Sequence, residues 1–339
     1  MTTPLSVCVV GAGAIGGSMA VRMARAGARV SVVARGAHGQ AIRDTGLTLQ
    51  SGTSGETVRL PCFDQPAGIA PHDVVVVAVK AAALPAVAPA LPALLAPGGL
   101  IVFAMNGIPW WFDAGWPMPL PERLRAALDP GGVLGRSIAP QTIVGAVVQS
   151  SNELIAPGVV LNSTPERNRM ILGRPDGSAD PLLDRFAALL NAGGYSAKVS
   201  PHIRDEIWTK TLLAASAGPV AALTGATLGA LADDADTRAV LAGVMREGAA
   251  VGHALGFTIT DDIDARLAFY RGKPVRPSML VDFEAGRDAE IENSILAIAD
   301  IAVALDIGVP VTRTVAALVR MKKAQLASNP SRPVAGFAS

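Results

Sequence analysis

The sequence predicts an α/β N-terminal domain built on a parallel sheet, followed by an all-helical C-terminal domain. Up to about residue 199, apolar runs that suit buried parallel strands alternate with helical patterns. From Ser200 to about residue 330, the apolar positions follow helical spacing only. We therefore expect one domain at residues 1–199, a second at residues 200–330 and a loose tail at residues 331–339.

The first expected strand, VCVV at residues 7–10, runs directly into a glycine-rich turn and then into a helix. In the turn, Gly11 allows the tight bend, Gly13 lets a pyrophosphate approach the backbone, and Gly16 lets the helix pack against the sheet. The N-terminus of that helix directs free N–H groups and a positive dipole end at the phosphates. We predict a dinucleotide site that comprises six residues: Gly11, Ala12, Gly13, Ala14, Ile15 and Gly16.

The second expected strand, in ARVSVVARG at residues 28–36, indicates which dinucleotide binds. An NAD site places Asp or Glu at the end of this strand, where the carboxylate accepts the ribose hydroxyl protons, whereas this chain has Arg35. A guanidinium cannot accept those protons, but it pairs well with a 2′-phosphate. We therefore favour NADP over NAD; the alternative is that Arg35 is a solvated surface charge.

Two further strands end in polar residues at the expected ligand edge of the sheet. After a short helix and a hairpin-like excursion at residues 36–63, an apolar run starts at Asp73 and ends near Lys80. Ligands bind at the carboxyl ends of such strands, although a surface lysine would fit the same position. A proline-punctuated helix follows, and the next strand is closed by Asn106, again over the cofactor.

The rest of the first domain carries weaker signals. The aromatic segment after Ile108 fits either a lid over the substrate or a packed loop. Strand-like stretches at residues 142–162 and 169–175 predict an extension of the sheet, and a helix ends at Gly193.

Helical patterns occupy the second half of the chain, at residues 201–218, 233–256, 260–270 and 279–327, with Ser200 expected to cap the first helix. Lys210 is followed by a surface of Ala, Leu and Gly, and burial there would lower its pKa and make it a better acid. The alternative is an exposed pair with Glu206, four residues earlier. Glu290 lies among several carboxylates, and the pattern alone does not single it out.

Composition and charge argue against several classes of protein. The 339 residues carry a formal charge of +1 with no basic run, which argues against a nucleic-acid surface. The two cysteines, Cys8 and Cys62, form no disulfide framework or metal-ligand spacing, and with no signal peptide we expect a cytoplasmic protein. Uncharged stretches at residues 81–112 and 211–232 are interrupted by Pro and Gly, so we expect buried elements and no membrane span.

Together these motifs resemble those of the ketopantoate reductase family, the 2-dehydropantoate 2-reductases. The resemblance rests on seven segments: GAGAIGG at 11–17, ARG at 34–36, VAVKA around Lys80, MNG around Asn106, EIWTK ending at Lys210, ALTG at 222–225 and SMLVDFEAGRDAEI at 278–291. It implies a Rossmann-type domain followed by a helical domain like that of 6-phosphogluconate dehydrogenases.

The resemblance also implies roles for single residues. Arg35 and Lys80 would hold the 2′-phosphate of NADPH, and Lys210 would be the general acid. Asn106, Ser278 and Glu290 would orient a 2-oxo acid, which is reduced to a 2-hydroxy acid. As partners we expect this small molecule and neither nucleic acid nor a membrane, with a homodimer left open.

The chain departs from the family pattern in the substrate half. Ala214, Gly218 and Leu228 stand where the family has asparagine, and Ser294–Leu296 replaces an expected glycine. Buried substrate groups that lose such partners cost about 1 to 3 kcal/mol each. We therefore expect 2-dehydropantoate or a less polar relative as the substrate. The competing hypotheses are a dehydrogenase of a different, less polar hydroxy compound and a non-catalytic NADPH-binding sensor.

Overall fold

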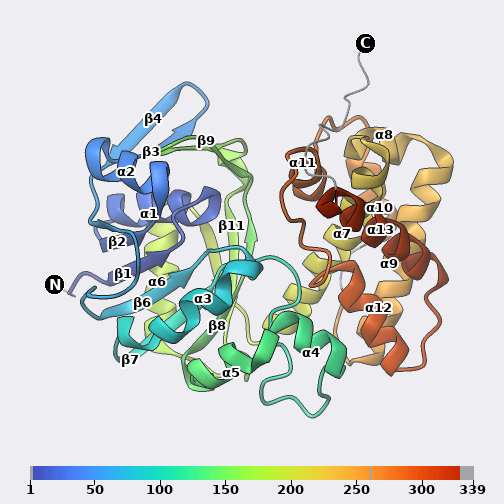
Figure 1. The fold of residues 1–339 in the computed structure, drawn as a ribbon, viewed down its shortest axis with the longest axis horizontal. Coiled ribbons are helices and arrows are strands. Elements are labelled where there is room, and N and C mark those ends of the chain that lie inside the picture. Colours follow the sequence, from blue (N-terminus) through green and yellow to red (C-terminus); the bar gives the residue numbers. More distant parts are fainter. Residues whose placement is uncertain (1–2, 260–261, 329–339) are drawn as a thin grey trace. The chain divides into compact units, whose positions relative to one another are not determined.

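The structure is a computed structural model that describes residues 3–259 and 262–328, and it contains two compact units (Figure 1). The first unit comprises Met1–Asn106, Trp110–Pro117 and Asp129–Ile203, and the second comprises Gly107–Pro109, Met118–Leu128 and Arg204–Ser339. The main division therefore falls between Ile203 and Arg204. The expected domain boundary at residues 199–200 stays a prediction.

An eight-stranded sheet in the order β12-β11-β8-β7-β6-β1-β2-β5 forms the centre of the first unit. The six strands from β8 to β5 are parallel, β11 runs antiparallel to β8, and β12 is parallel to β11. This sheet confirms the predicted α/β class. Its strands are β1 (Ser6–Val10), β2 (Arg29–Val33), β5 (Cys62–Phe63), β6 (His72–Val77), β7 (Leu95–Phe103), β8 (Ile143–Gln149), β11 (Arg169–Gly173) and β12 (Ser196–Val199).

The strand register brings four strand ends to one level. Val10 of β1 pairs with Val33 of β2 and with Val77 of β6, and Val77 pairs with Phe103 of β7. Each of these residues is the last of its strand. The loops that follow the four strands therefore leave from one edge of the sheet, which is where such sheets bind ligands.

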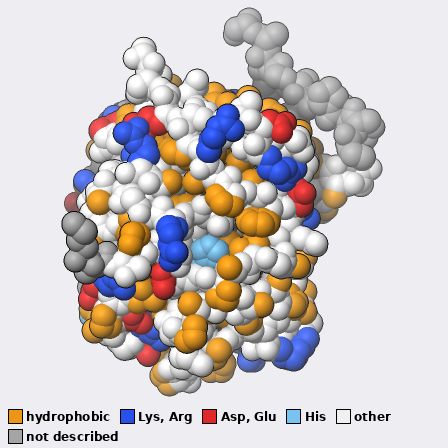
Figure 2. Space-filling view, turned by 90° about the vertical axis from the view of Figure 1, so that its left-hand side faces the viewer, with side chains coloured by type: hydrophobic (Ala, Val, Ile, Leu, Met, Phe, Trp, Pro, Cys, Tyr) orange, Lys and Arg blue, Asp and Glu red, His pale blue; other side chains and the backbone are white. Residues whose placement is uncertain are grey.

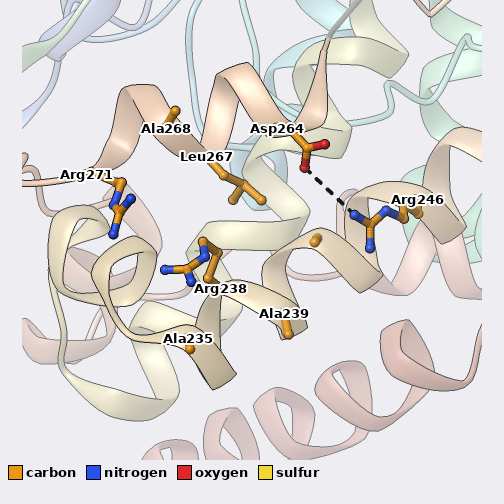
Figure 3. A pocket seen from close by; sticks show the side chains of 9 residues that line it. Ala235, Arg238, Ala239, Arg246, Asp264, Leu267, Ala268 and Arg271 are labelled. Carbon is orange, nitrogen blue, oxygen red and sulfur yellow. Dashed lines mark ion pairs between the residues drawn. The ribbon is translucent and has the colours of Figure 1, made fainter.

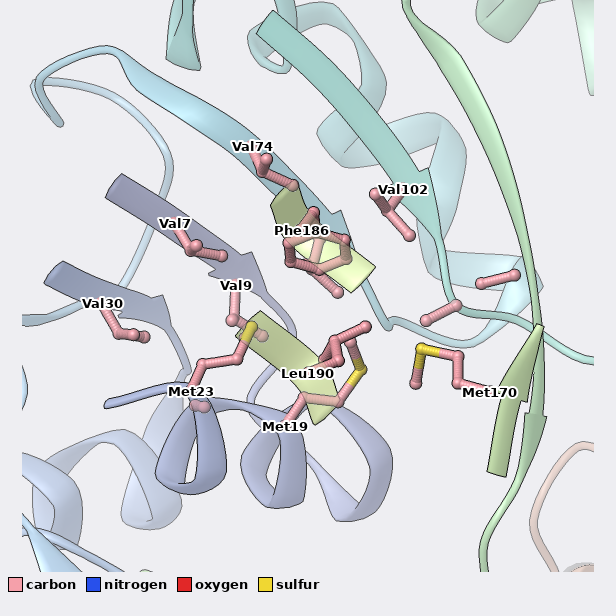
Figure 4. Packing of buried hydrophobic residues seen from close by; sticks show 14 of the residues in the cluster. Val7, Val9, Met19, Met23, Val30, Val74, Val102, Met170, Phe186 and Leu190 are labelled. Atoms are coloured by element: carbon pink, nitrogen blue, oxygen red, sulfur yellow. The ribbon is translucent and has the colours of Figure 1, made fainter. Parts of the chain in front are cut away.

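One face of this sheet is covered by α1 (Ala14–Arg25) and α6 (Pro181–Ala192). Figure 4 shows Met19 and Met23 of α1 with Phe186 and Leu190 of α6, packed with valines of the central strands. The expected helix after Lys80 is broken into short pieces because Pro85, Pro89 and Pro92 each stand in the first turn of a separate piece. These pieces are three 3-10 turns (Ala81–Ala83, Ala88–Ala90, Pro92–Leu94) and α3 (Leu84–Val87).

A second sheet of four strands, in the order β4-β3-β10-β9, corrects one expectation. Residues 152–162 do not extend the main sheet, because β10 pairs parallel with β3 and antiparallel with β9. Most of β9 is exposed, which does not suit a strand buried on both faces. The expected helix and hairpin at residues 36–63 are confirmed as α2 (Gly36–Thr45), β3 (Leu47–Ser51) and β4 (Ser54–Val58); the other two strands are β9 (Asn152–Ala156) and β10 (Val159–Asn162).

The aromatic segment after Ile108 packs as a loop. Trp111 and Phe112 are fully buried, and the Trp111 ring occupies the space beside Gly145 of β8. A Cβ atom at Gly145 would lie 2.6 Å from that ring. The structure thus favours the packed loop over the lid. Two short helices follow, α4 (Glu122–Leu128) and α5 (Val133–Ser137).

The described residues after Val199 contain helices and no strand, as predicted. Besides α4, the second unit holds α7 (Ile203–Thr224), α8 (Leu228–Asp233), α9 (Ala235–Ala254), α10 (Ile263–Tyr270), α11 (Ser278–Glu284), α12 (Ile295–Ala304) and α13 (Pro310–Ser328). No helix in the described part of the chain has the length and apolar character that crossing a bilayer requires. On the face shown in Figure 2, Lys and Arg side chains are scattered and do not form one basic patch.

Several helix ends differ from expectation. Ser200 does not cap α7, because its Oγ accepts from the N–H of His202 and the helix begins at Ile203. The same helix continues through Pro219 to Thr224. The almost continuous helical pattern expected at residues 279–327 forms three helices, separated at segments with left-handed backbone at Gly286 (φ 63°) and Asp306 (φ 53°). Of the helix expected at residues 260–270, positions 260–261 lie outside the described residues.

Candidate functional site

Each of the three motif glycines in the turn, Gly11, Gly13 and Gly16, has its own structural role. Gly11 adopts φ 95°, which side chains rarely tolerate. A Cβ atom at Gly16 would lie 2.1 Å from the carbonyl oxygen of Gly11, so only glycine lets α1 approach the turn. Gly13 is the N-cap of α1, and a Cβ atom at this position would have no neighbour within 4 Å. The turn is therefore closed beneath Gly11 and Gly16 and open at Gly13, as a phosphate-binding turn requires.

Three other predicted residues leave the same edge of the sheet. Arg35 is two residues beyond the end of β2, and Lys80 and Asn106 are each three residues beyond the ends of β6 and β7. All three are exposed. Arg35 is also the N-cap of α2, in extended conformation. Exposed cations beside an open glycine turn suit a ligand with a pyrophosphate and a further phosphate, so the residues present fit an NADP cofactor.

In the second unit, Lys210 and Glu290 are electrostatically coupled. Lys210 lies on α7 and is half-buried. Burial lowers the pKa of its ammonium group to about 8, and the negative charge of Glu290 acts in the opposite direction and raises it. A lysine with this pKa can donate a proton near neutral pH. Lys210 is therefore partly buried on α7, and its role as the acid stays a prediction.

Glu290 lies in the irregular segment between α11 and α12. The hydroxyl of Ser294 donates to the carbonyl oxygen of Glu290 at 2.7 Å and so fixes the backbone at this residue. The neighbouring carboxylate of Glu292 is bound by Lys323, at 2.9 and 3.0 Å. The structure therefore separates two carboxylates that the sequence pattern did not, because the charge of Glu290 raises the pKa of Lys210 whereas Glu292 is bound by Lys323.

The surface of α7 beyond Lys210 is small and apolar. Ala214 is exposed, and Gly218 lies under Met279 of α11, whose Cβ would be 3.4 Å from a Cβ at Gly218. Ser278, next to Met279, is exposed and is the first residue of α11, whose N-cap is Pro277. Leu228 begins α8, where its N–H donates to the carbonyl of Val275. None of the three replaced positions offers an amide side chain here.

Sequence reasoning missed two residues beside these groups. Asn293 is buried; its carbonyl accepts from the N–H of Ile108 at 2.6 Å, and its side chain leaves no room for a Cβ at Gly107. His38, in the first turn of α2, contacts the glycine turn directly. No local motif marks either residue, because both contacts join segments far apart in the chain.

A hollow of about 380 Å³ between α9 and α10 lies elsewhere in the second unit (Figure 3). It contains three arginines, but each has a partner. Arg238 donates to the carbonyl of Ala232, Arg271 pairs with Asp233, and Arg246 pairs with Asp264. None of the predicted site residues lines this hollow, so we do not place the reaction there.

Comparisons with known proteins decide the family. Residues 7–175 match the family model "Ketopantoate reductase PanE/ApbA", and residues 202–323 match its C-terminal counterpart. A 2-dehydropantoate 2-reductase from Mesorhizobium japonicum is 35% identical over 319 residues, which cover 93% of this chain and 97% of the relative. The chain belongs to the ketopantoate reductase family. A second 2-dehydropantoate 2-reductase, from Halobacterium salinarum, is 25% identical over 94% of the chain and 98% of its own length.

Solved structures agree with this membership. A ketopantoate reductase of the PanE/ApbA family from Ralstonia eutropha has a TM-score of 0.79 and 28% identity, covering 95% of this chain and 100% of its own. A D-mandelate dehydrogenase solved with NADH and anilino(oxo)acetate shares the fold, with a TM-score of 0.80 and 17% identity over 95% of this chain and 100% of its own. For the chain described here, these comparisons confirm the expected family, the two-part fold and an NADP-dependent oxidoreductase class.

Proposed function

We propose that this protein is an NADPH-dependent reductase that converts a 2-oxo acid to a 2-hydroxy acid, with 2-dehydropantoate or a less polar relative as the substrate. The observation that carries the proposal is the environment of Lys210, whose pKa is lowered to about 8 in a chain that also has an open glycine turn. Family membership supports the same reaction class.

The first unit would bind the cofactor. The N–H groups at the start of α1 would hold the pyrophosphate, and Arg35 and Lys80 would hold the 2′-phosphate. When bound, NADPH supplies the hydride that reaches the carbonyl carbon. Lys210 would donate a proton from Nζ to the developing alkoxide oxygen, which its charge also stabilises. Glu290 favours the ammonium form of Lys210, and Glu290, Asn106 and Ser278 would orient the acid.

Replacing Arg35 by serine is expected to weaken the binding of NADPH but not that of NADH. A charge-assisted hydrogen bond contributes about 1.5 to 3 kcal/mol, so the KM for NADPH should rise about 10- to 100-fold. The KM for NADH should change little, because NADH has no 2′-phosphate. Arg43→Ser is the matched control, since Arg43 lies on the same helix and pairs with Asp64. An equal effect of Arg35→Ser on both cofactors would contradict the assignment.

Steady-state oxidation of NADPH tests the proposed function. The panel contains 2-dehydropantoate, the same acid without its terminal hydroxyl, and other 2-oxo acids. We expect turnover of the first two with kcat/KM values within about tenfold, because a pocket that hydrogen-bonds a substrate hydroxyl would instead discriminate by about 10⁴-fold or more. Reduction of NADP⁺ by a hydroxy compound, without any reduction of a 2-oxo acid by NADPH, would favour the dehydrogenase. Tight NADPH binding without turnover of any compound would favour the sensor.

A further inference from the structure

His38 joins three segments of the first unit. It lies in the first turn of α2, three residues after Arg35, and is half-buried. One ring nitrogen, Nε2, lies 2.7 Å from the carbonyl oxygen of Ala12 in the glycine turn. The other, Nδ1, accepts from the N–H of Gly158 at 2.9 Å. Gly158 lies in the turn between β9 and β10 of the second sheet.

These two contacts define the protonation state of the ring. A peptide N–H can only donate, so Nδ1 of His38 must be the unprotonated nitrogen. The carbonyl of Ala12 can only accept, so Nε2 must carry the hydrogen. His38 is therefore a neutral imidazole, protonated at Nε2, with both nitrogens used.

The bond to Ala12 fixes the direction of the next N–H group, that of Gly13. In a planar trans peptide, the carbonyl of Ala12 and the N–H of Gly13 point in opposite directions. Holding the Ala12 oxygen toward His38 therefore directs the Gly13 N–H away from it. The peptide groups before Ala12 are held separately, because the N–H groups of Gly11 and Ala12 both donate to the carbonyl of Val33, at 3.0 and 3.3 Å.

The second sheet supports His38 from the other side. The carbonyl of Gly158 accepts from the N–H of Thr48 on β3 at 2.8 Å. A Cβ at Gly158 would lie 3.2 Å from the side chain of Ala41 on α2, and Gly158 has φ 78°, so the turn fits closely against this helix. The position of the imidazole is thus fixed by both α2 and the β9–β10 turn.

We propose that His38 is a positioning residue for the cofactor: it orients the Ala12–Gly13 peptide so that the Gly13 N–H is available to the pyrophosphate. Through the same ring it couples the glycine turn to α2, whose N-cap is Arg35, and to the second sheet. This role rests on the proposed function, in which the glycine turn binds NADPH.

The test is NADPH binding, measured by fluorescence titration without substrate, for wild type, His38→Leu and His38→Gln. Leucine can make neither hydrogen bond, so the Kd for NADPH should rise about three- to tenfold, while kcat at saturating NADPH stays within about twofold. Glutamine can donate from its amide nitrogen and accept at its oxygen, so His38→Gln should recover most of the affinity. Unchanged affinity in His38→Leu, or no recovery in His38→Gln when both variants have the same Tm, would overturn the proposal.

A second measurement does not depend on the cofactor. The ¹⁵N chemical shifts of the His38 ring in the free protein should report an unprotonated Nδ1 and a protonated Nε2 at neutral pH; the opposite tautomer would overturn the role of His38. Wild-type protein that binds no NADPH but shows the expected tautomer would instead contradict the proposed function, and the positioning role with it.

Discussion

Replacing Lys210 by alanine is expected to lower kcat for reduction of a 2-oxo acid by about 10²- to 10⁴-fold, the usual contribution of a positioned general acid. The loss should appear in kcat and kcat/KM alike, because the proton is needed only as the alkoxide forms. The Kd for NADPH should change little, since the cofactor is assigned to the first unit. Steady-state kinetics and a separate NADPH titration measure the two effects.

Lys198→Ala provides the matched control for this variant. Lys198 is an exposed lysine on β12, and its removal should leave kcat within about twofold. Turnover in Lys210→Ala that equals the wild-type rate would refute the assignment of Lys210 as the acid. A fall in Tm large enough to account for the loss of activity would also contradict this assignment, because the proposed role of Lys210 is chemical.

The second large effect is expected for Gly13→Val. Nothing lies within 4 Å of a Cβ at this position, so the side chain has space in the free protein, and the backbone (φ −69°, ψ −153°) lies at the edge of the extended region. The valine would occupy the space through which the pyrophosphate approaches. Losing two charge-assisted hydrogen bonds corresponds to about 3 to 6 kcal/mol, so the Kd for NADPH should rise by more than about 100-fold. Calorimetric titration with NADPH measures this.

Gly308→Val is the control for the glycine turn. Gly308 also has open space around its Cβ position and no left-handed backbone, but it lies in the helical unit. Gly13→Val should lose only a few degrees of Tm, since replacing an N-cap glycine costs about 1 kcal/mol, and Gly308→Val, at an exposed position before α13, should lose no more. NADPH binding in Gly13→Val at the wild-type Kd would show that the cofactor does not approach this turn.

Much of the first unit could be predicted from local pattern. Continuous Val-rich runs identified β1, β2 and β6, and the glycine spacing identified the turn, because each of these features depends on neighbours in the chain. The second sheet could not be predicted in this way. It pairs β3 with β10 across more than 100 residues, and no local signal specifies such pairing.

Helix ends in the second unit were harder to predict than helix positions. The apolar pattern from Met279 onward continues through segments that the backbone breaks, at Gly286 and at Asp306. The sequence itself carries signals for this break, because Asp tolerates left-handed backbone and Gly308 and Pro310 follow within four residues. Helix α7 shows the opposite case, since it continues through Pro219, where the sequence predicted an end.

The sequence predicted which kinds of residues form the candidate site, but it predicted only some of the contacts between them. Arg35, Lys80 and Asn106 follow strand ends, and the strand register confirms that they leave one edge of the sheet. The sequence could not decide between the carboxylates near Glu290, because the choice depends on which of them faces Lys210 and which is bound by Lys323. The catalytic and binding roles of all these residues remain predictions.

The most direct test of the account is the pH dependence of hydride transfer in single turnover, followed by NADPH absorbance. The acid is the ammonium form of Lys210, so the rate should be highest below its pKa and fall above about pH 8. Glu290→Gln removes the charge that raises this pKa, so the fall should move to lower pH, while Glu292→Gln should leave it in place. A rate that does not fall between pH 7 and 9, or a fall that Glu290→Gln does not move, would contradict the proposed role of Lys210.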